Sequence, residues 1–142
     1  MVNREPAVEG FDGLLGLEVI ELSDERARGR VVVRGELTQG AGAVHGGVYA
    51  AVAEAIASIG AAVAARTLDP EAGVVGLDNH TSFLRAARAG TEIVAEARPR
   101  LAGRRTQSWD VTMRDPDGRE LAVSRVRLLV APLAGLPHGR SP

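Results

Sequence analysis

The stretch that most constrains the fold runs from Val48 to Arg66 and reads VYAAVAEAIASIGAAVAAR. Alanine is the strongest helix former and the stretch contains no proline, so it predicts one long helix. The helix is apolar nearly all round, which is typical of a helix that the rest of the protein covers on most sides. A chain of 142 residues must build that cover from what remains of its sequence.

The remaining sequence favours strands. Two short strand candidates, residues 17–22 and 27–34, are joined by Ser23, Asp24 and Glu25 and predict a hairpin before the helix. Four further candidates follow the helix, at residues 74–84, 92–101, 106–114 and 120–130. Their connections are too short for crossover helices, so we expect consecutive strands to run mainly antiparallel, the last four as a meander.

These elements predict an α+β architecture in which a curved antiparallel sheet of five to six strands wraps one long central helix, the hotdog fold. We expect a single domain over residues 1–142, with flexible tails at about 1–10 and 132–142. Part of the helix would stay bare and the sheet would keep open edges, so a homodimer is expected.

Composition excludes several classes of function. The 17 Lys+Arg nearly balance 18 Asp+Glu, so no long-range field attracts nucleic acid or an anionic membrane, and a small-molecule partner is expected. The absence of cysteine excludes thiolate nucleophiles and Cys-ligated metals, and the three histidines lack metal-ligand spacing. We therefore expect no metal and no cofactor. The charged N-terminus has no apolar run, which predicts a cytoplasmic protein.

Glu54 is the only charged residue between Gly46 and Ala65. Burying an unpaired carboxylate is costly, so such a residue is usually paired or functional. Two interpretations stay open: a pair with an arginine or a solvated helix edge, and a general base or nucleophile. Ser58, one turn further along the same face, can bond Glu54 or hold a water, or simply bond its own backbone.

Gly46 and Gly47 stand directly before the apolar run. The first N–H groups of a helix lack intrahelical partners and lie at its positive end, so an oxygen acquiring negative charge would be stabilised there. A flexible helix start is the alternative. Gln39 and His45 lie in the preceding loop, where the Gln39 amide can donate to a carbonyl oxygen or remain solvated.

The spacing of Gly46 and Glu54 has a quaternary consequence. Eight residues of helix separate them, or roughly 12 Å along the axis. A carbonyl carbon under attack must lie within about 3 Å of both the nucleophile and the oxyanion donor. We therefore expect Gly46 of one subunit and Glu54 of another to share each site.

Three arginines could meet phosphate groups. Arg85 closes the run NHTSFLR, and Arg104 and Arg105 lie in a turn beside Thr106. The planar guanidinium forms bidentate hydrogen bonds with phosphate, and Thr106 adds a hydroxyl. A solvated hairpin tip is the alternative for the two arginines of the turn.

Four motifs together resemble a known family: VHGGVYAAVAE at residues 44–54, NHTSFLR at 79–85, WDVTMRDPDGR at 109–119 and AVS at 122–124. The stretch 39–130 is similar to the hotdog-fold acyl-CoA thioesterases, in the 4-hydroxybenzoyl-CoA thioesterase branch that uses a helix glutamate. The resemblance implies that Glu54 attacks the thioester carbon or activates water and that Gly46 polarises the thioester carbonyl. It also implies that Gln39 assists at that oxygen and that Ser58 replaces a family threonine.

The same resemblance assigns the substrate-binding residues. It implies that His45 and Gly47 lie beside the site and that Asp78 and Asn79 border the acyl pocket. It places Arg85 near the CoA nucleotide. The segment holding Arg104, Arg105 and Thr106 would contact CoA.

The sequence thus predicts hydrolysis of an aromatic acyl-CoA to a carboxylate and CoA by a homodimer, with two dimers joined into a tetramer. Two rivals remain. One is a non-catalytic acyl-CoA-binding module, which would bind CoA esters without releasing thiol. The other is an enoyl-CoA hydratase of the same fold, for which the sequence offers no Asp-plus-His arrangement.

Overall fold

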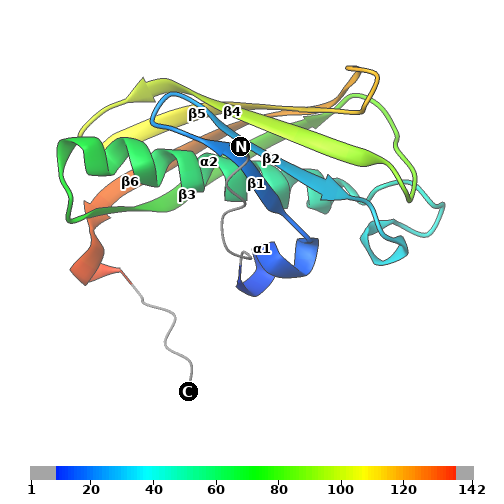
Figure 1. Cartoon of the computed structure of the whole chain (residues 1–142), viewed down its shortest axis with the longest axis horizontal. Coiled ribbons are helices and arrows are strands. Elements are labelled where there is room, and N and C mark those ends of the chain that lie inside the picture. The colour runs from blue at the N-terminus through cyan, green and yellow to red at the C-terminus, as the bar shows by residue number, and fades with distance from the viewer. Residues whose placement is uncertain (1–8, 137–142) are drawn as a thin grey trace.

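A long helix, α2 (Gly46–Leu68), runs through the length of the molecule, and the sheet curls around it (Figure 1). The structure, a computed structural model, describes residues 9–136. The predicted helix was placed at residues 48–66, so the observed helix is longer by two residues at each end. Its central position confirms the predicted architecture.

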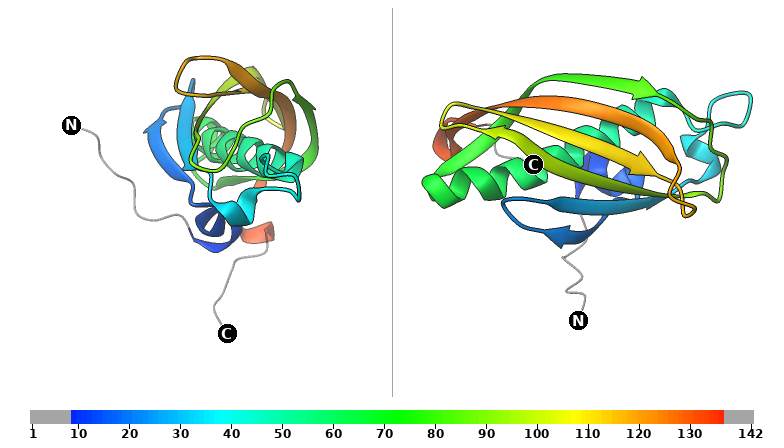
Figure 2. Two further views of the ribbon diagram at one scale, coloured as in Figure 1. Left: turned by 90° about the vertical axis from the view of Figure 1, so that its right-hand side faces the viewer. Right: turned by 90° about the horizontal axis from the view of Figure 1, so that it is seen from above.

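The sheet has six strands: β1 (Glu18–Leu22), β2 (Ala27–Val32), β3 (Ala72–Phe83), β4 (Glu92–Ala102), β5 (Thr106–Arg114) and β6 (Glu120–Pro132). Their spatial order is β1-β2-β4-β5-β6-β3, and every hydrogen-bonded pair is antiparallel. Figure 2 shows how strongly this sheet is twisted and curved around the helix. The hairpin of β1 and β2 is confirmed.

The predicted meander of the last four strands is wrong in one strand. β4, β5 and β6 form a meander, but β3 pairs with β6, from Ala72 opposite Pro132 to Phe83 opposite Ala122. β4 instead pairs with β2. The connection over residues 84–91 therefore crosses the end of the sheet from β3 to β4. Its length suits a hairpin as well as a crossing, so the sequence alone does not choose between them. As a result β3 forms an edge of the sheet.

The core lies between α2 and the concave face of the sheet. Ile56 of α2 is fully buried, as are Trp109 and Met113 of β5. Gly60 makes room for the indole, because a Cβ there would lie 2.7 Å from Trp109 Cζ3. Gln107 secures this contact: its Nε2 donates to the Ala61 carbonyl (3.2 Å) and its Oε1 accepts from Trp109 Nε1 (2.7 Å).

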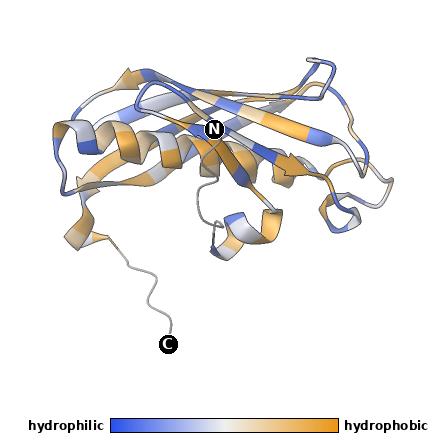
Figure 3. Ribbon diagram, in the orientation of Figure 1, coloured by the Kyte–Doolittle hydropathy of each residue, from blue (hydrophilic) through white to orange (hydrophobic). Residues whose placement is uncertain are grey.

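α2 has the length and composition of a membrane-crossing helix, with a mean hydropathy of 1.8 over its most apolar window. Of that window, 61% is buried inside the protein. Figure 3 shows α2 coloured mainly as hydrophobic or neutral where the sheet surrounds it. The helix is therefore a core helix of this fold.

Both expected tails contain structure in their described parts. A short helix, α1 (Gly10–Leu15), packs on α2 and is fastened by Arg34, which donates to the carbonyls of Leu14 (2.7 Å) and Leu15 (3.3 Å). Gly16 ends α1 with φ 77°. At the other end, β6 reaches Pro132 and a 3₁₀ turn, η2 (Leu133–Gly135), follows. Another such turn, η1 (Gly35–Leu37), follows β2. The rest of the two predicted tails, residues 1–8 and 137–142, lies outside the described residues.

Candidate functional site

The start of α2 presents one unpaired N–H group. His45 caps the helix: its Nδ1 accepts the Gly47 N–H (2.8 Å) and its carbonyl accepts the Val48 N–H (2.9 Å). Within residues 9–136, the Gly46 N–H donates to no other group. Of the two glycines, Gly46 is thus the one whose N–H is free at the positive end of a 23-residue helix. Since Nδ1 accepts a bond, the neutral His45 ring carries its proton on Nε2.

Gly46 lines a cavity of about 450 Å³, which we call the helix-start cavity. Gln39, Tyr49, Phe83 and Arg85 line it as well. The structure therefore brings Arg85 to Gln39 and Gly46, although Arg85 lies far from both in the sequence. The Gln39 side-chain oxygen accepts the Ala41 N–H, an arrangement that holds the amide in the loop.

Two aromatic residues of the helix-start cavity were not predicted. The Phe83 ring lies against Gly46, where a Cβ would come within 2.8 Å of Phe83 Cζ. Tyr49 packs beside it, with ring centroids 6.2 Å apart. Tyr49 is 3% exposed, and its hydroxyl has no hydrogen-bond partner among the described residues. Burial raises the pKa of Tyr49.

Gly47 and His45 face a second cavity, of about 490 Å³. Phe11 and Leu14 of α1 form part of its wall. The helix start thus separates two cavities. Only the first of them is lined by Gly46, whose N–H is free.

Glu54 lies on the open face of α2, between α1 and β3. Its carboxylate forms no hydrogen bond or ion pair with any residue between 9 and 136, so the interpretation as an arginine pair is wrong for the described chain. Glu54 is exposed in the single chain, whereas the sequence predicted a largely covered helix. Its Oε1 lies against Gly76 of β3, where a Cβ would collide with this carboxylate, and the register of β3 is irregular between Gly76 and Asp78.

A second carboxylate accompanies Glu54. The pKa of Asp12 in α1 is raised, first by partial burial and then by the negative charge of Glu54. The short α1 gave no usable periodicity, so the sequence did not reveal Asp12. Ser58 is half-buried one turn after Glu54, with no side-chain hydrogen bond to the protein within residues 9–136.

Asp78 and Asn79 are adjacent but have different surroundings. Asn79 Nδ2 donates to the Ala50 carbonyl of α2 (2.8 Å), and its Oδ1 accepts from the Thr81 hydroxyl (2.7 Å). Asn79 therefore fastens β3 to the helix. Asp78 pairs with Arg127, which lowers the pKa of Asp78, and the structure does not bring it to the helix-start cavity.

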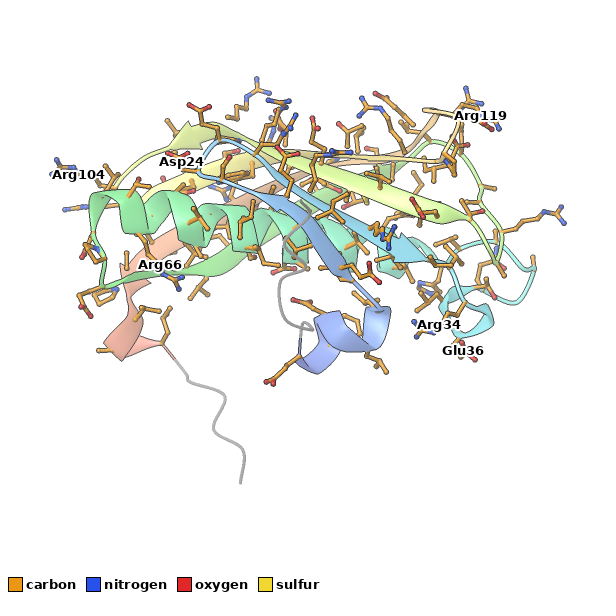
Figure 4. All side chains as sticks on the ribbon, viewed as in Figure 1. Asp24, Arg34, Glu36, Arg66, Arg104 and Arg119 are labelled. Atoms are coloured by element: carbon orange, nitrogen blue, oxygen red, sulfur yellow. The ribbon has the colours of Figure 1, made fainter. Side chains whose placement is uncertain are left out.

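Arg104, Arg105 and Thr106 lie at the other end of α2. Arg104 borders a cavity of about 300 Å³ beside Leu68 and Asp69, and Figure 4 shows it at the C-terminal end of the helix. The 22 helical steps from Gly46 to Leu68 amount to roughly 33 Å. One chain therefore does not bring these residues to Gly46. The unbroken helix also keeps Gly46 and Glu54 roughly 12 Å apart along its axis.

No group of three or more histidine or carboxylate side chains in residues 9–136 has the proximity to hold a metal ion. The groups that the structure offers for chemistry include the free N–H, the unpaired carboxylate, and the polar side chains around them. Together they can polarise a carbonyl and supply a nucleophile or base.

Comparisons with known proteins agree with this chemistry. The Thioesterase superfamily profile matches residues 41–122. A Mycobacterium tuberculosis protein described as an esterase is 42% identical over 118 residues, covering 83% of this chain and 84% of the relative. Its solved structure has a TM-score of 0.82 at 39% identity, over 89% of this chain and 98% of the other.

Two further proteins extend the comparison. A 1,4-dihydroxy-2-naphthoyl-CoA hydrolase from Listeria monocytogenes is 31% identical over 121 residues, covering 85% of this chain and 95% of the relative. The solved structure of a thioesterase from Haemophilus influenzae has a TM-score of 0.82 at 30% identity, over 94% of this chain and 90% of the other.

Proposed function

Because the chain belongs to the Thioesterase superfamily and is a hotdog-fold thioester hydrolase, we propose that it cleaves an aromatic acyl-CoA to the free carboxylate and CoA. One observation carries the proposal: an unpaired Glu54 carboxylate lies on the same helix whose first residue, Gly46, has a free N–H. The Listeria relative, named for a dihydroxynaphthoyl ester, supports an aromatic acyl group. The proposed reaction uses no metal or redox cofactor, because Glu54 supplies the nucleophile or base, the Gly46 N–H stabilises the oxyanion, and hydrolysis transfers no electrons.

The catalytic site is formed by two subunits. β3 is an edge strand with exposed apolar side chains, Val75 (41%) and Leu77 (48%), and it lies beside the open face of α2. Antiparallel pairing of two such edges about a twofold axis covers both, removes the open edge and lays the two helices side by side. Glu54 then faces Gly46 of the partner subunit, and the roughly 12 Å between them in one chain is no obstacle. Two such dimers form the tetramer.

The reaction proceeds at the thioester carbonyl carbon. The free N–H of Gly46 donates to the carbonyl oxygen and stabilises the negative charge that grows there, assisted by the Gln39 amide. Glu54 of the facing subunit follows one of two routes. It attacks the carbon and forms an anhydride as the C–S bond breaks, which water then hydrolyses, or it takes a proton from water, whose oxygen attacks. In both routes the departing sulfur receives a proton. Ser58 lies one turn away and holds the water.

The same arrangement gives the distant arginines a role. Arg104 lies near Ala65 of α2, which is 11 helical residues beyond Glu54, or roughly 17 Å along the helix axis. In the antiparallel arrangement, Gly46 of the partner subunit lies beside Glu54. The start of the partner's helix, with its Arg85, then lies on the side of Glu54 that faces the C-terminal end of α2. A CoA nucleotide leaving the thioester in this direction meets Arg85 of one subunit and Arg104, Arg105 and Thr106 of the other. The guanidinium groups bind its phosphates.

Release of free thiol from a panel of aryl-, arylacetyl- and alkyl-CoA esters tests the proposal. Glu54→Ala should reduce kcat by at least about 10²-fold, because it removes the nucleophile or base. Its melting temperature should be retained, because the side chain is exposed and unpaired in the single chain. Glu71→Ala, which removes an exposed carboxylate from the turn that follows α2, is the matched control. Wild-type thiol release by the Glu54 variant would refute the assignment. CoA-ester binding by the wild type without thiol release would favour a binding module.

A further inference from the structure

A bulge in β3 changes which of its side chains face α2. Residues directly opposite one another in a sheet point to the same face. Gly76 lies opposite Leu128, which is buried against the helix, whereas Asp78 lies opposite Arg127 on the outer face. The register shifts between these two pairs, so Leu77 is the extra residue of the bulge. Without the bulge, Asp78 would follow Gly76 by two residues on the same face and point toward α2.

The bulge leaves Gly76 facing Glu54. A Cβ at Gly76 would collide with Glu54 Oε1, whereas Glu54 Cδ would lie 3.5 Å from it, an ordinary contact distance. After the bulge, Asn79 faces the helix and donates to the Ala50 carbonyl (2.8 Å). The Glu54 carboxylate can therefore lie in its present orientation because the residue opposite it has no side chain and Asp78 is turned away.

A like charge lies on the other side of Glu54. Asp12 belongs to α1, which packs on α2, and its pKa is raised first by partial burial and then by the negative charge of Glu54. Repulsion between the two carboxylates disfavours an orientation in which Glu54 turns toward α1. Within residues 9–136 the Glu54 carboxylate forms no ion pair. Repulsion on one side and the contact with Gly76 on the other therefore define its orientation.

We propose that Gly76 is a positioning residue: the space beside it, which the bulge preserves, holds the Glu54 carboxylate in the orientation that thioester hydrolysis requires. This inference rests on the proposed function and adds the residue that orients its nucleophile or base. In the proposed dimer the partner's helix start reaches this same seam between α2 and β3, so the carboxylate is held where the ester carbonyl binds. Bulges are over-represented beside active sites, where they redirect side chains.

Gly76→Ala tests the proposal, because the added methyl group meets the free end of an exposed side chain. Glu54 can move away, so the melting temperature should stay within a few degrees of the wild-type value. The kcat for thiol release should fall by about 10–10²-fold, since a misplacement of about 1 Å is enough for such a loss. The dissociation constant of a non-hydrolysable thioether analogue should stay close to that of the wild type. Wild-type kcat in a folded Gly76→Ala variant would overturn the proposal.

The Glu54→Asp background distinguishes positioning from a structural effect of the methyl group. Aspartate is shorter by one methylene, so its carboxylate oxygens reach only as far as the present Cδ and clear the new Cβ. Glu54→Asp alone should lower kcat, and adding Gly76→Ala should then lower it little further. The same fold-loss from Gly76→Ala in both backgrounds would mean that the methyl group acts elsewhere in the fold, and the positioning role would be wrong.

Crystal structures of the wild type and of Gly76→Ala give a readout that does not depend on rates. The Glu54 carboxylate should contact Gly76 in the wild type and be displaced in the variant, and an unchanged carboxylate position would contradict the proposal. The Glu54→Ala variant separates the two proposals. If it releases thiol as the wild type does, the proposed function fails together with the positioning role. If it is inactive while Gly76→Ala is fully active, the positioning role alone fails.

Discussion

Replacing Gly46 with proline removes the backbone N–H that we assign to the oxyanion. Proline is favoured at the first position of a helix, because the N–H it lacks has no intrahelical partner there. The residue before a proline must be extended, and His45 already is, with φ −64° and ψ 133°. α2 should therefore begin at the same residue in the variant.

The effect of the added side chain on kcat must be distinguished from the effect of losing the N–H. A Cβ at position 46 comes within 2.8 Å of Phe83 Cζ, whether it belongs to proline or alanine. Phe83 is 59% exposed, so its ring can turn away. Gly46→Ala has the same collision and keeps the N–H, which makes it the matched control. Loss of one oxyanion donor costs about 10²–10³ in kcat, or about 2.7–4 kcal/mol of transition-state stabilisation.

We expect kcat of Gly46→Pro to fall below that of Gly46→Ala by this factor, measured as thiol release at saturating ester. The melting temperatures of the two variants should agree within a few degrees. Equal kcat values in two folded variants would refute the role of the Gly46 N–H. If the alanine variant is already inactive, the same comparison in a Phe83→Leu background removes the collision and decides the question.

Three further predictions concern the subunit contact, the core and pH. Random mixing of inactive Glu54→Ala and Gly46→Pro subunits should restore about a quarter of the wild-type sites, because half the dimers are mixed and each has one intact site; no recovery would contradict a shared site. Gly60→Ala forces a Cβ to 2.7 Å from Trp109, so the free energy of unfolding in urea should fall by up to about 2 kcal/mol, the overpacking cost less the gain in helix propensity from alanine. Asp12→Asn should raise the free energy of unfolding at pH 7 by less than about 1 kcal/mol, and the melting temperature slightly with it. The pKa of the Asp12 carboxyl is raised in the folded chain, so the stabilisation that this carboxyl provides is present below pH 3.8 and is lost as the pH rises. That gain should vanish at low pH, and a gain that grows on acidification would refute the sign.

The sequence was sufficient for the fold class and for the central helix and the six strands, because these signals are local. A long alanine-rich run without proline strongly favours a helix, and alternation along residues 106–114 specifies which side of β5 faces the core. The position of β3 was not available, since it depends on a connection that suits both a hairpin and a crossing. Helix α1 was missed because its six residues are too few to show a period.

Some residues of the candidate site could be predicted from local sequence signals and others could not. Gly46 was predictable because a helix start imposes unpaired N–H groups on whatever residue stands there. Glu54 was predictable because it is the only charge between residues 46 and 65. Tyr49 and Asp12 were not, because their significance depends on contacts: a hydroxyl without a partner and a carboxyl near another carboxyl, each between segments that meet only in the folded chain.

The two adjacent glycines look alike in the sequence and have different roles in the structure. A Cβ on Gly47 would lie 2.9 Å from His45 Nδ1, the atom that caps the helix, so glycine here protects the cap. A Cβ on Gly46 would meet Phe83 instead, so glycine there protects the wall of the helix-start cavity. His45 occupies the Gly47 N–H and thereby leaves Gly46 as the donor with no partner in the described chain. The interpretation as a merely flexible helix start does not account for these contacts, because both glycines are packed against rings. The cap and the free N–H are therefore one arrangement, in which the cap occupies the Gly47 N–H and leaves the Gly46 N–H available.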